Sequence, residues 1–216
     1  MKKNLTFLLI MLTFIEFVLV EVKADKVLFY TDYTNGKIGM YNITTNTNSD
    51  LLTGLSSPRG LDVDPINQKI YWIYFNNQKL KRCNYDGNTI EDVVNLGFNP
   101  HTIAIDPTNG LIFITKWSIG SALYVVKTNG SGLTLLVASD AVDVEIDEVN
   151  HYVYYTDGYY DIYRADYNTT NGALSNTSSI NSTIAETSES IGFDQANGKL
   201  FVIDFSTFYL FCLFFR

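Results

Sequence analysis

Carboxylates that recur at regular positions are the side chains best suited to chemistry in this sequence. Oxygen ligands that converge from several strands suit a divalent cation such as calcium, as in a metal-dependent hydrolase. However, Asp at the start of a turn also accepts hydrogen bonds from its own backbone. A residue repeated once per structural unit is typical of architecture, so we expect structural roles and no metal or cofactor. The residues are Asp62, Asp64, Asp106, Asp143, Asp147 and Asp194.

The cysteines and histidines show no catalytic pattern. Cys83 lies inside a predicted strand, which favours a buried free thiol, whereas Cys212 lies near the C-terminus; a Cys83–Cys212 disulfide is the alternative in a secreted chain. His101 and His151 each lack a second ligand at metal-site spacing. No nucleophile elbow, His-Glu-x-x-His or phosphate-binding loop occurs. We therefore expect a protein that is not an enzyme.

The segments that must position these side chains form a repeat. From Pro58 to Val94, three alternating apolar runs and a short fourth run are separated by turn signals such as Asp-Pro and Asp-Gly-Asn. This pattern predicts four short antiparallel strands. A four-stranded unit that recurs at this length predicts an all-β fold built from propeller blades. The aromatic strand recurs at intervals of 42, 42, 41 and 47 residues, starting at Phe29, Tyr71, Phe113, Tyr154 and Phe201.

The repeat resembles the LDL-receptor class B, or YWTD, repeat. Gly-Leu-Asp-Val-Asp-Pro precedes the aromatic strand, Asn-Tyr-Asp-Gly-Asn follows the basic strand, and Tyr-Thr-Asp closes the aromatic strand in the first and fourth copies. The resemblance covers Lys26 to Asp204 and implies a six-bladed propeller. The other copies depart from Thr-Asp, which is replaced by Ile73-Tyr74, Thr115-Lys116 and Ile203-Asp204.

The resemblance also implies a function. In this family, protein segments dock on the top face, formed by the loops that lead into the inner strands and follow the aromatic strands. Aromatic rings beside charges provide what an interface hot spot needs. We therefore expect a module that binds a protein or peptide; in the alternative interpretation, the rings pack between blades. The residues carried over are Asp32, Tyr33, Arg59, Phe75, His101, Trp117, Asp157 and Tyr159.

The number of strands predicts an incomplete propeller of about four and a half blades. The first blade begins with its aromatic strand at Lys26, so we expect it to lack an inner strand of its own. Three complete blades follow, and residues 190–204 supply two more strands, which makes seventeen. Open edges left by the missing strands favour self-association.

Two further segments interrupt the repeat. Residues 167–188 are rich in Asn, Ser and Thr, and they predict an exposed, glycosylated loop with a short strand near 179–185. Residues 206–216 are apolar without alternation, and they predict a tail outside the repeat. The expected organisation is thus a signal peptide (1–24), a partial propeller (25–205) and this tail.

The N-terminus predicts secretion. Lys2 and Lys3 precede an apolar run, and Val22-Lys23-Ala24 offers a cleavage site. An uncleaved anchor is the alternative, although the run is shorter than the ~20 residues that span a bilayer, so we expect no membrane insertion. Asn-x-Ser/Thr sequons, which we expect in turns or loops and glycosylated, agree with an extracellular location. They begin at Asn42, Asn129, Asn168, Asn176 and Asn181.

The charge and the repeat together favour one function over two alternatives. A net charge of −8 argues against nucleic acid or an anionic membrane as the partner. We expect a secreted, non-enzymatic protein-binding propeller. The alternatives are a calcium-dependent, lactonase-like hydrolase and a truncated product that cannot close its ring and has no function.

Overall fold

The computed structural model describes residues 17–22, 25–116, 120–157, 161–181, 188–204 and 209–214. The regular secondary structure among these residues consists of β-strands, which form five antiparallel sheets in chain order. The strands are β1 (Phe17–Val22), β2 (Asp25–Asp32), β3 (Lys37–Asn42), β4 (Thr47–Leu52), β5 (Pro58–Asp64), β6 (Lys69–Tyr74), β7 (Lys79–Asn84), β8 (Glu91–Asn95), β9 (Pro100–Asp106), β10 (Leu111–Lys116), β11 (Ala122–Lys127), β12 (Thr134–Val137), β13 (Val144–Asp147), β14 (Tyr152–Thr156), β15 (Ile162–Tyr167), β16 (Leu174–Asn181), β17 (Ser188–Asp194), β18 (Lys199–Asp204) and β19 (Tyr209–Phe214).

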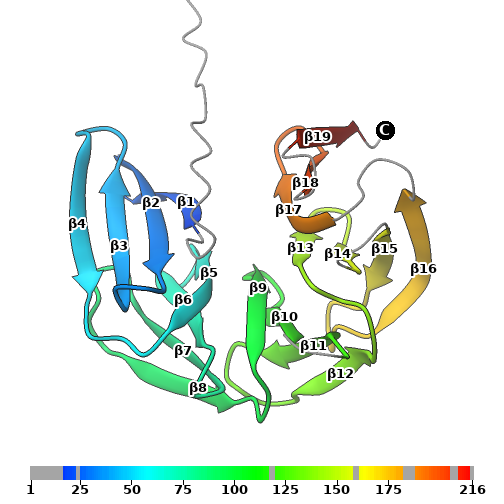
Figure 1. The fold of residues 1–216 in the computed structure, drawn as a ribbon, viewed down its shortest axis with the longest axis horizontal. Coiled ribbons are helices and arrows are strands. Elements are labelled where there is room, and N and C mark those ends of the chain that lie inside the picture. Colours follow the sequence, from blue (N-terminus) through cyan, green and yellow to red (C-terminus); the bar gives the residue numbers. More distant parts are fainter. Residues whose placement is uncertain are drawn as a thin grey trace, which may run out of the picture.

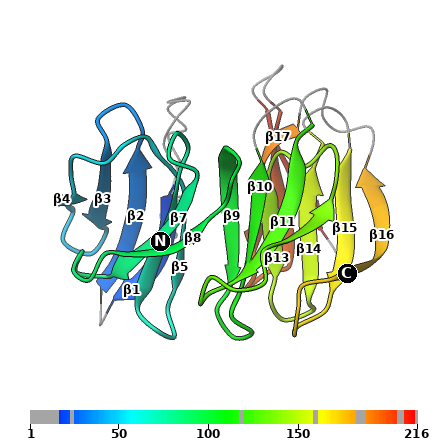
Figure 2. The ribbon, with the colours of Figure 1, turned by 90° about the horizontal axis from the view of Figure 1, so that it is seen from below.

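Each sheet is one blade of an incomplete β-propeller. Blades 1 to 4 are the four-stranded sheets β1–β4, β5–β8, β9–β12 and β13–β16, and blade 5 is the three-stranded sheet β17–β19. The blades form an open arc with the first strand of each blade toward the centre (Figure 1). In the view from below, the strands run between two faces on which the connecting loops gather (Figure 2). The predicted all-β, incomplete propeller is confirmed.

The core consists of apolar layers between successive blades. In β6, every residue from Ile70 to Tyr74 is buried, because neighbouring blades cover both faces of this sheet. Ile70 and Trp72 pack with residues of blade 1, whereas Tyr71 and Ile73 pack with residues of blade 3. Alternating side chains of one strand therefore serve two interfaces, and this explains why the aromatic strands are apolar throughout.

The turns between the first two strands of blades 2 to 5 are closed by one repeated pair of side chains. The Asp that ends the inner strand accepts the backbone N–H of the Asn three residues later, and its second oxygen accepts the Asn side-chain amide. These bonds span 2.7–3.2 Å. The architectural role predicted for these carboxylates is confirmed. The pairs are Asp64–Asn67, Asp106–Asn109, Asp147–Asn150 and Asp194–Asn197.

Blade 1 differs from the sequence-based expectation. It has an inner strand, β1, which pairs antiparallel with β2 from Phe17 opposite Tyr30 to Val22 opposite Asp25. The apolar residues that predict the end of a signal peptide also suit an inner strand, so the sequence pattern alone does not separate the two roles. The expectation that blade 1 lacks an inner strand of its own is therefore wrong.

The C-terminal half differs in two places. The fourth strand of blade 4, β16, runs from Leu174 to Asn181 and thus begins before the strand that we expected near 179–185. Tyr209–Phe214, which we expected to lie outside the repeat, forms β19 and pairs with β18 along its length. The described residues therefore contain nineteen strands instead of seventeen. An apolar run without alternation is ambiguous in sequence, because a strand covered on both faces has the same pattern.

Candidate functional site

Three of the residues expected on the top face meet at the junction of blades 1 and 2. Arg59 is the second residue of β5, Tyr33 lies in the β2–β3 turn, and Phe75 follows β6. The Cζ atom of Arg59 lies over both rings, 5.7 Å from the Tyr33 centroid and 5.0 Å from the Phe75 centroid. All three side chains are partly buried. We call these residues the Arg59 cluster; a guanidinium this close to an aromatic face is attracted by the ring quadrupole.

The local backbone directs Arg59 toward these rings. The pairing of β5 with β6 shifts register between Arg59 and Leu61, and such a β-bulge re-aims the side chains beside it. Gly60 lies within the bulge and against blade 3. A Cβ atom at Gly60 would lie 2.8 Å from Cδ1 of Ile73 and 3.0 Å from the carbonyl oxygen of His101, so a larger residue would require the Ile73 side chain and the backbone of β9 to shift.

Asp32 positions the turn that carries Tyr33. Its Oδ1 accepts the backbone N–H of Asn35 at 2.9 Å, and its Oδ2 accepts the Asn35 side-chain amide at 2.7 Å. The Asn35 side-chain hydrogen bond is the main cause that lowers the pKa of Asp32. The carboxylate is therefore ionised at neutral pH and engaged with its own turn, so its part in the cluster is to hold Tyr33 in place.

His101 connects blades 3 and 4 next to the Arg59 cluster. Its Nδ1 lies 3.0 Å from the carbonyl oxygen of Val142, which makes Nδ1 the protonated nitrogen, because a carbonyl can only accept. Burial lowers the pKa of His101 to about 4, and the charge of Arg59 acts in the same direction. The ring is therefore neutral at physiological pH and serves as a donor between blades.

Asp157, a further residue predicted for the top face, makes its hydrogen bonds within its own blade. Asp157 belongs to blade 4, where its backbone N–H donates to the carbonyl oxygen of Asp161 and its Oδ1 accepts the N–H of Asp161 at 3.1 Å. Asp161 in turn accepts a hydrogen bond from Ser179 at 3.0 Å. Trp117 and Tyr159 lie outside the described residues.

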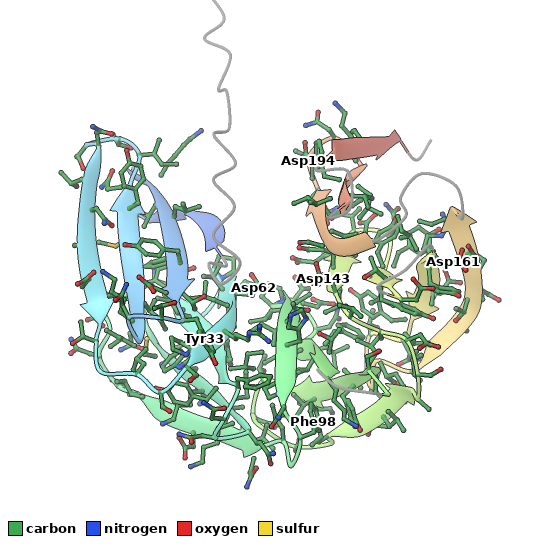
Figure 3. The ribbon with its side chains drawn as sticks, in the orientation of Figure 1. Tyr33, Asp62, Phe98, Asp143, Asp161 and Asp194 are labelled. Carbon is green, nitrogen blue, oxygen red and sulfur yellow. The ribbon has the colours of Figure 1, made fainter. Side chains whose placement is uncertain are left out.

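Two acids, one in β5 and one directly before β13, join neighbouring blades at the centre of the arc (Figure 3). Asp62 accepts the N–H of Val63 at 2.7 Å and, from blade 3, the N–H of Ile105 at 2.8 Å. Asp143 accepts the N–H of Val144 at 2.9 Å and, from blade 5, the N–H of Ile191 at 2.8 Å. The sequence identified both acids but not their partners, because bonds between repeats follow from packing rather than from spacing.

Burial is the main cause that raises the pKa values of these two acids and of nearby Glu148. It raises the pKa of Asp62 to about 7, and the charge of Glu148 adds to the effect. Burial also raises the pKa of Asp143, and it raises the pKa of Glu148 to about 7 with help from Asp106, Asp147 and Asp64. Within the described ranges, no group of three or more His, Cys, Asp or Glu side chains has an arrangement suited to a metal ion.

The two cysteines are free thiols in separate blades. Cys83 is buried in β7 of blade 2, and burial raises its pKa to about 12. Cys212 is exposed in β19 of blade 5. The Cys83–Cys212 disulfide considered from the sequence is therefore not formed, and the prediction of a buried free thiol at Cys83 is confirmed.

The sequons divide into two groups. Asn129 and Asn168 are exposed and lie outside the strands, as expected. Asn42 is the last residue of β3, and Asn176 and Asn181 belong to β16, so the expectation that every sequon falls in a turn or loop is wrong for these three. Within the described part of the chain, no helix is long and apolar enough to cross a membrane.

Comparisons with known proteins establish the fold. No protein-family model matches the sequence, and no curated protein matches it significantly. A chain of the nidogen/laminin complex superposes with a TM-score of 0.74 at 20% identity, covering 87% of this chain and 73% of that one. A gluconolactonase from Xanthomonas campestris gives 0.67 at 16% identity, covering 82% and 66%.

A third neighbour is the catalytically inactive virginiamycin B lyase from Staphylococcus aureus, solved with quinupristin. Its TM-score is 0.65 at 20% identity, and the match covers 90% of this chain and 65% of the lyase. The present chain thus spans about two thirds to three quarters of these neighbours. At such low identities the likeness shows the propeller fold, and the neighbours include both a binding protein and enzymes.

Proposed function

We propose that this chain is an extracellular, non-enzymatic module that binds a protein or peptide segment on the top face of its propeller, at the Arg59 cluster. The contact of Arg59 with Tyr33 and Phe75 carries the proposal. The rings offer large contact area at a low entropic cost, and the guanidinium offers directed hydrogen-bond donors. These residue types are the ones that dominate binding energy at protein interfaces.

A structural neighbour supports a protein ligand. That neighbour was solved in a complex of nidogen with laminin, so a propeller of this shape takes part in a protein assembly there. The Arg59 cluster is the part of the expected top face that the described residues bring together. Asp32 holds the Tyr33 turn and His101 joins two blades, so both act on the cluster by positioning it.

An enzymatic role is the second candidate, because a gluconolactonase and a lyase are also neighbours. Such a role would draw on the acids at the centre of the arc. Asp62 and Asp143 each accept two backbone N–H groups, and these bonds occupy both oxygens of each carboxylate. Because these carboxylates already accept backbone hydrogen bonds, the arrangement favours the binding role over hydrolysis. Trp117 and Tyr159 remain part of the proposed top face.

The proposal includes secretion, with residues 1–24 removed and the sequons glycosylated. Cleavage after Ala24 would remove β1 and leave the inner edge of β2 unpaired. N-terminal sequencing of the protein from a secreting host tests this step, with Asp25 as the expected first residue. Met1 or Phe17 at the N-terminus would show that β1 is retained.

A random peptide library displayed on phage tests the binding site. We expect peptides enriched on the wild-type protein to lose about tenfold or more in affinity with Arg59→Ala, a change of about 1.4 kcal/mol in binding free energy. Arg164→Ala is the matched control, because Arg164 lies 4.6 Å from the centroid of Tyr152, outside the cluster. It should bind like the wild type.

Three outcomes would contradict the proposal. Equal loss with Arg59→Ala and Arg164→Ala would indicate general destabilisation. Peptides that bind both variants with the same affinity as the wild type would show that the site lies elsewhere. Aggregation without a cooperative thermal transition would support the truncated, non-functional alternative, and light scattering with a thermal melt decides that point before any panning.

A further inference from the structure

The outer strands of blades 1, 2 and 3 can be compared at one position, directly after a shift of register between the third and fourth strands. In blade 1, Gly39 lies opposite Asp50 there, and in blade 2 Lys81 lies opposite Asp92. Asp50 forms an ion pair with Lys37 at 2.9 Å, and Asp92 forms one with Lys81 at 2.5 Å. The rims of blades 1 and 2 are therefore charged at this position.

Blade 3 has apolar side chains at the same position. Tyr124 of β11 lies opposite Leu135 of β12, directly after the register shift. Directly opposed residues project from the same face of a sheet, so these two side chains are neighbours. Phe98 stacks on Tyr124, with the ring centroids 4.2 Å apart and the ring planes inclined by 22°. We call Phe98, Tyr124 and Leu135 the blade 3 rim patch.

The blade 3 rim patch is accessible from outside the arc. Leu135 is 48% exposed, and Phe98 and Tyr124 are partly exposed. Figure 3 shows Phe98 on the outer side of the arc, away from Asp62 and Asp143 at its centre. Exposed apolar side chains that contact one another mark an interaction surface, whereas singly scattered ones do not.

A hydrogen bond between two loops connects the rim patch to the Arg59 cluster. Phe75 begins the loop after β6, and Phe98 lies in the loop that leads into β9. The side-chain amide of Gln78, in the first loop, donates to Oδ1 of Asn99, in the second, at 3.0 Å. This bond holds the two loops, and the aromatic side chains that they carry, in one arrangement.

We propose that the blade 3 rim patch is a second anchor site for the peptide ligand, an inference that rests on the proposed function. The ligand runs as an extended segment from the Arg59 cluster across the junction of blades 2 and 3. Three strand spacings of about 4.8 Å separate the inner from the outer strand of a blade, or about 14 Å. An extended chain advances about 3.4 Å per residue, so about four to five residues of the ligand cover this path.

The chemistry of the rim patch defines the second anchor as an apolar side chain. A leucine or phenylalanine of the ligand gains free energy when it leaves water against these three residues. A charged side chain would lose its hydration there without gaining a partner of opposite charge. The ligand class is therefore an extended peptide with an apolar residue about four to five positions from the part that contacts Arg59.

Substitutions in the rim patch test the proposal on peptides that a phage-displayed random library enriches on the wild-type protein. The double variant Tyr124→Lys/Leu135→Asp installs the Lys81–Asp92 pair of blade 2, so it removes the apolar surface and keeps a pair that this position of the fold accommodates. We expect the double variant to lower the affinity of these peptides about tenfold or more. Ile90→Asp is the matched control, because Ile90 is 49% exposed in the β7–β8 loop on the opposite face. It should bind like the wild type.

Shortened peptides give a second measurement. Removal of the residues that reach the rim patch should lower the affinity for the wild type to the value that the full peptide has for the double variant. The shortened peptide should bind both proteins equally and still lose affinity with Arg59→Ala. A thermal melt of each variant shows that it is folded before its affinity is measured.

The outcomes separate this inference from the proposed function. Wild-type affinity in the double variant, together with a loss in Arg59→Ala, would overturn the second anchor and leave the proposed function in place. A loss in the double variant without a loss in Arg59→Ala would contradict the proposed function itself. An equal loss in Ile90→Asp would assign the effect to added negative charge and would also overturn the second anchor.

Discussion

Tyr167 of blade 4 donates its hydroxyl to Oδ2 of Asp106 in blade 3 at a distance of 2.7 Å. The same carboxylate closes its own turn with Asn109, so one side chain both shapes a turn and joins two blades. At the matching position after the third strand of blade 2, the hydroxyl of Tyr85 is buried and has no hydrogen-bond partner among the described residues. The repeat thus contains a matched pair of tyrosines, only one of which forms this bond.

Replacing these tyrosines with phenylalanine should separate their contributions. Tyr167→Phe removes the bond to Asp106 and should lower the free energy of unfolding by about 1 kcal/mol. Tyr85→Phe removes a buried hydroxyl without a partner and should be neutral or slightly stabilising. Urea unfolding of both variants measures the difference. Equal losses would show that the bond between blades contributes nothing specific.

Asp62 should make stability depend on pH. Burial raises its pKa from 3.8 to about 7, so the folded chain holds this proton more tightly than the unfolded chain. The contribution to stability is full below pH 3.8 and is lost as the pH rises toward about 7. Asp62→Asn stays neutral and keeps an oxygen for the N–H of Ile105, so the variant should lose this pH dependence.

The comparison needs the difference between variant and wild type, measured as the free energy of unfolding at several pH values. Glu148, whose pKa is also raised to about 7, contributes in the same direction, and Glu148→Gln should remove that part. Asp32 and Asp194 have lowered pKa values and act in the opposite direction in both proteins. If the free energy of unfolding of Asp62→Asn changed with pH as steeply as that of the wild type, the raised pKa assigned to Asp62 would be refuted.

Trp72 should be among the residues on which stability depends most. Its side chain is 0% exposed and fills the layer between blades 1 and 2. Trp72→Ala should lower the free energy of unfolding by about 3–5 kcal/mol. Leu135→Ala, at a residue that is 48% exposed on β12, should change it by less than about 0.5 kcal/mol. Similar effects of the two changes would contradict the packing of the blades.

Glycosylation should concentrate at Asn129 and Asn168. Both are exposed, and in each the Oδ1 atom accepts backbone N–H groups of its own loop, which leaves the amide nitrogen for a glycan. Protein from a secreting host should lose mass on treatment with peptide N-glycosidase. Asn129→Gln and Asn168→Gln should each remove one glycan, and an unmodified wild-type mass would argue against secretion.

The fold was largely predictable because the same pattern of strands and turns recurs in each blade. The aromatic strand that starts at Tyr71 occurs within β6, and the Asp64–Asn67 turn recurs in each later blade. The segments that escaped prediction are the ones whose apolar residues fit more than one role. Phe17–Val22 reads as part of a signal peptide and forms an inner strand, and Tyr209–Phe214 reads as a tail and forms β19.

The candidate site was only partly predictable. The family resemblance supplied Tyr33, Arg59 and Phe75 as separate positions, and the structure brings them into contact. Spacing within one repeat could not show this contact, because it joins two blades. The same limit applies to Asp62 and Ile105, whose bond depends on how neighbouring inner strands are offset.

Hydrogen–deuterium exchange with a peptide enriched on the wild-type protein tests the central claim most directly. Binding at the Arg59 cluster should slow exchange in the turn between β2 and β3, at the start of β5 and in the loop after β6, while the turns closed by Asp64, Asp106 and Asp147 keep their rates. Protection confined to those turns at the opposite ends of the inner strands, with none around Arg59, would contradict the account.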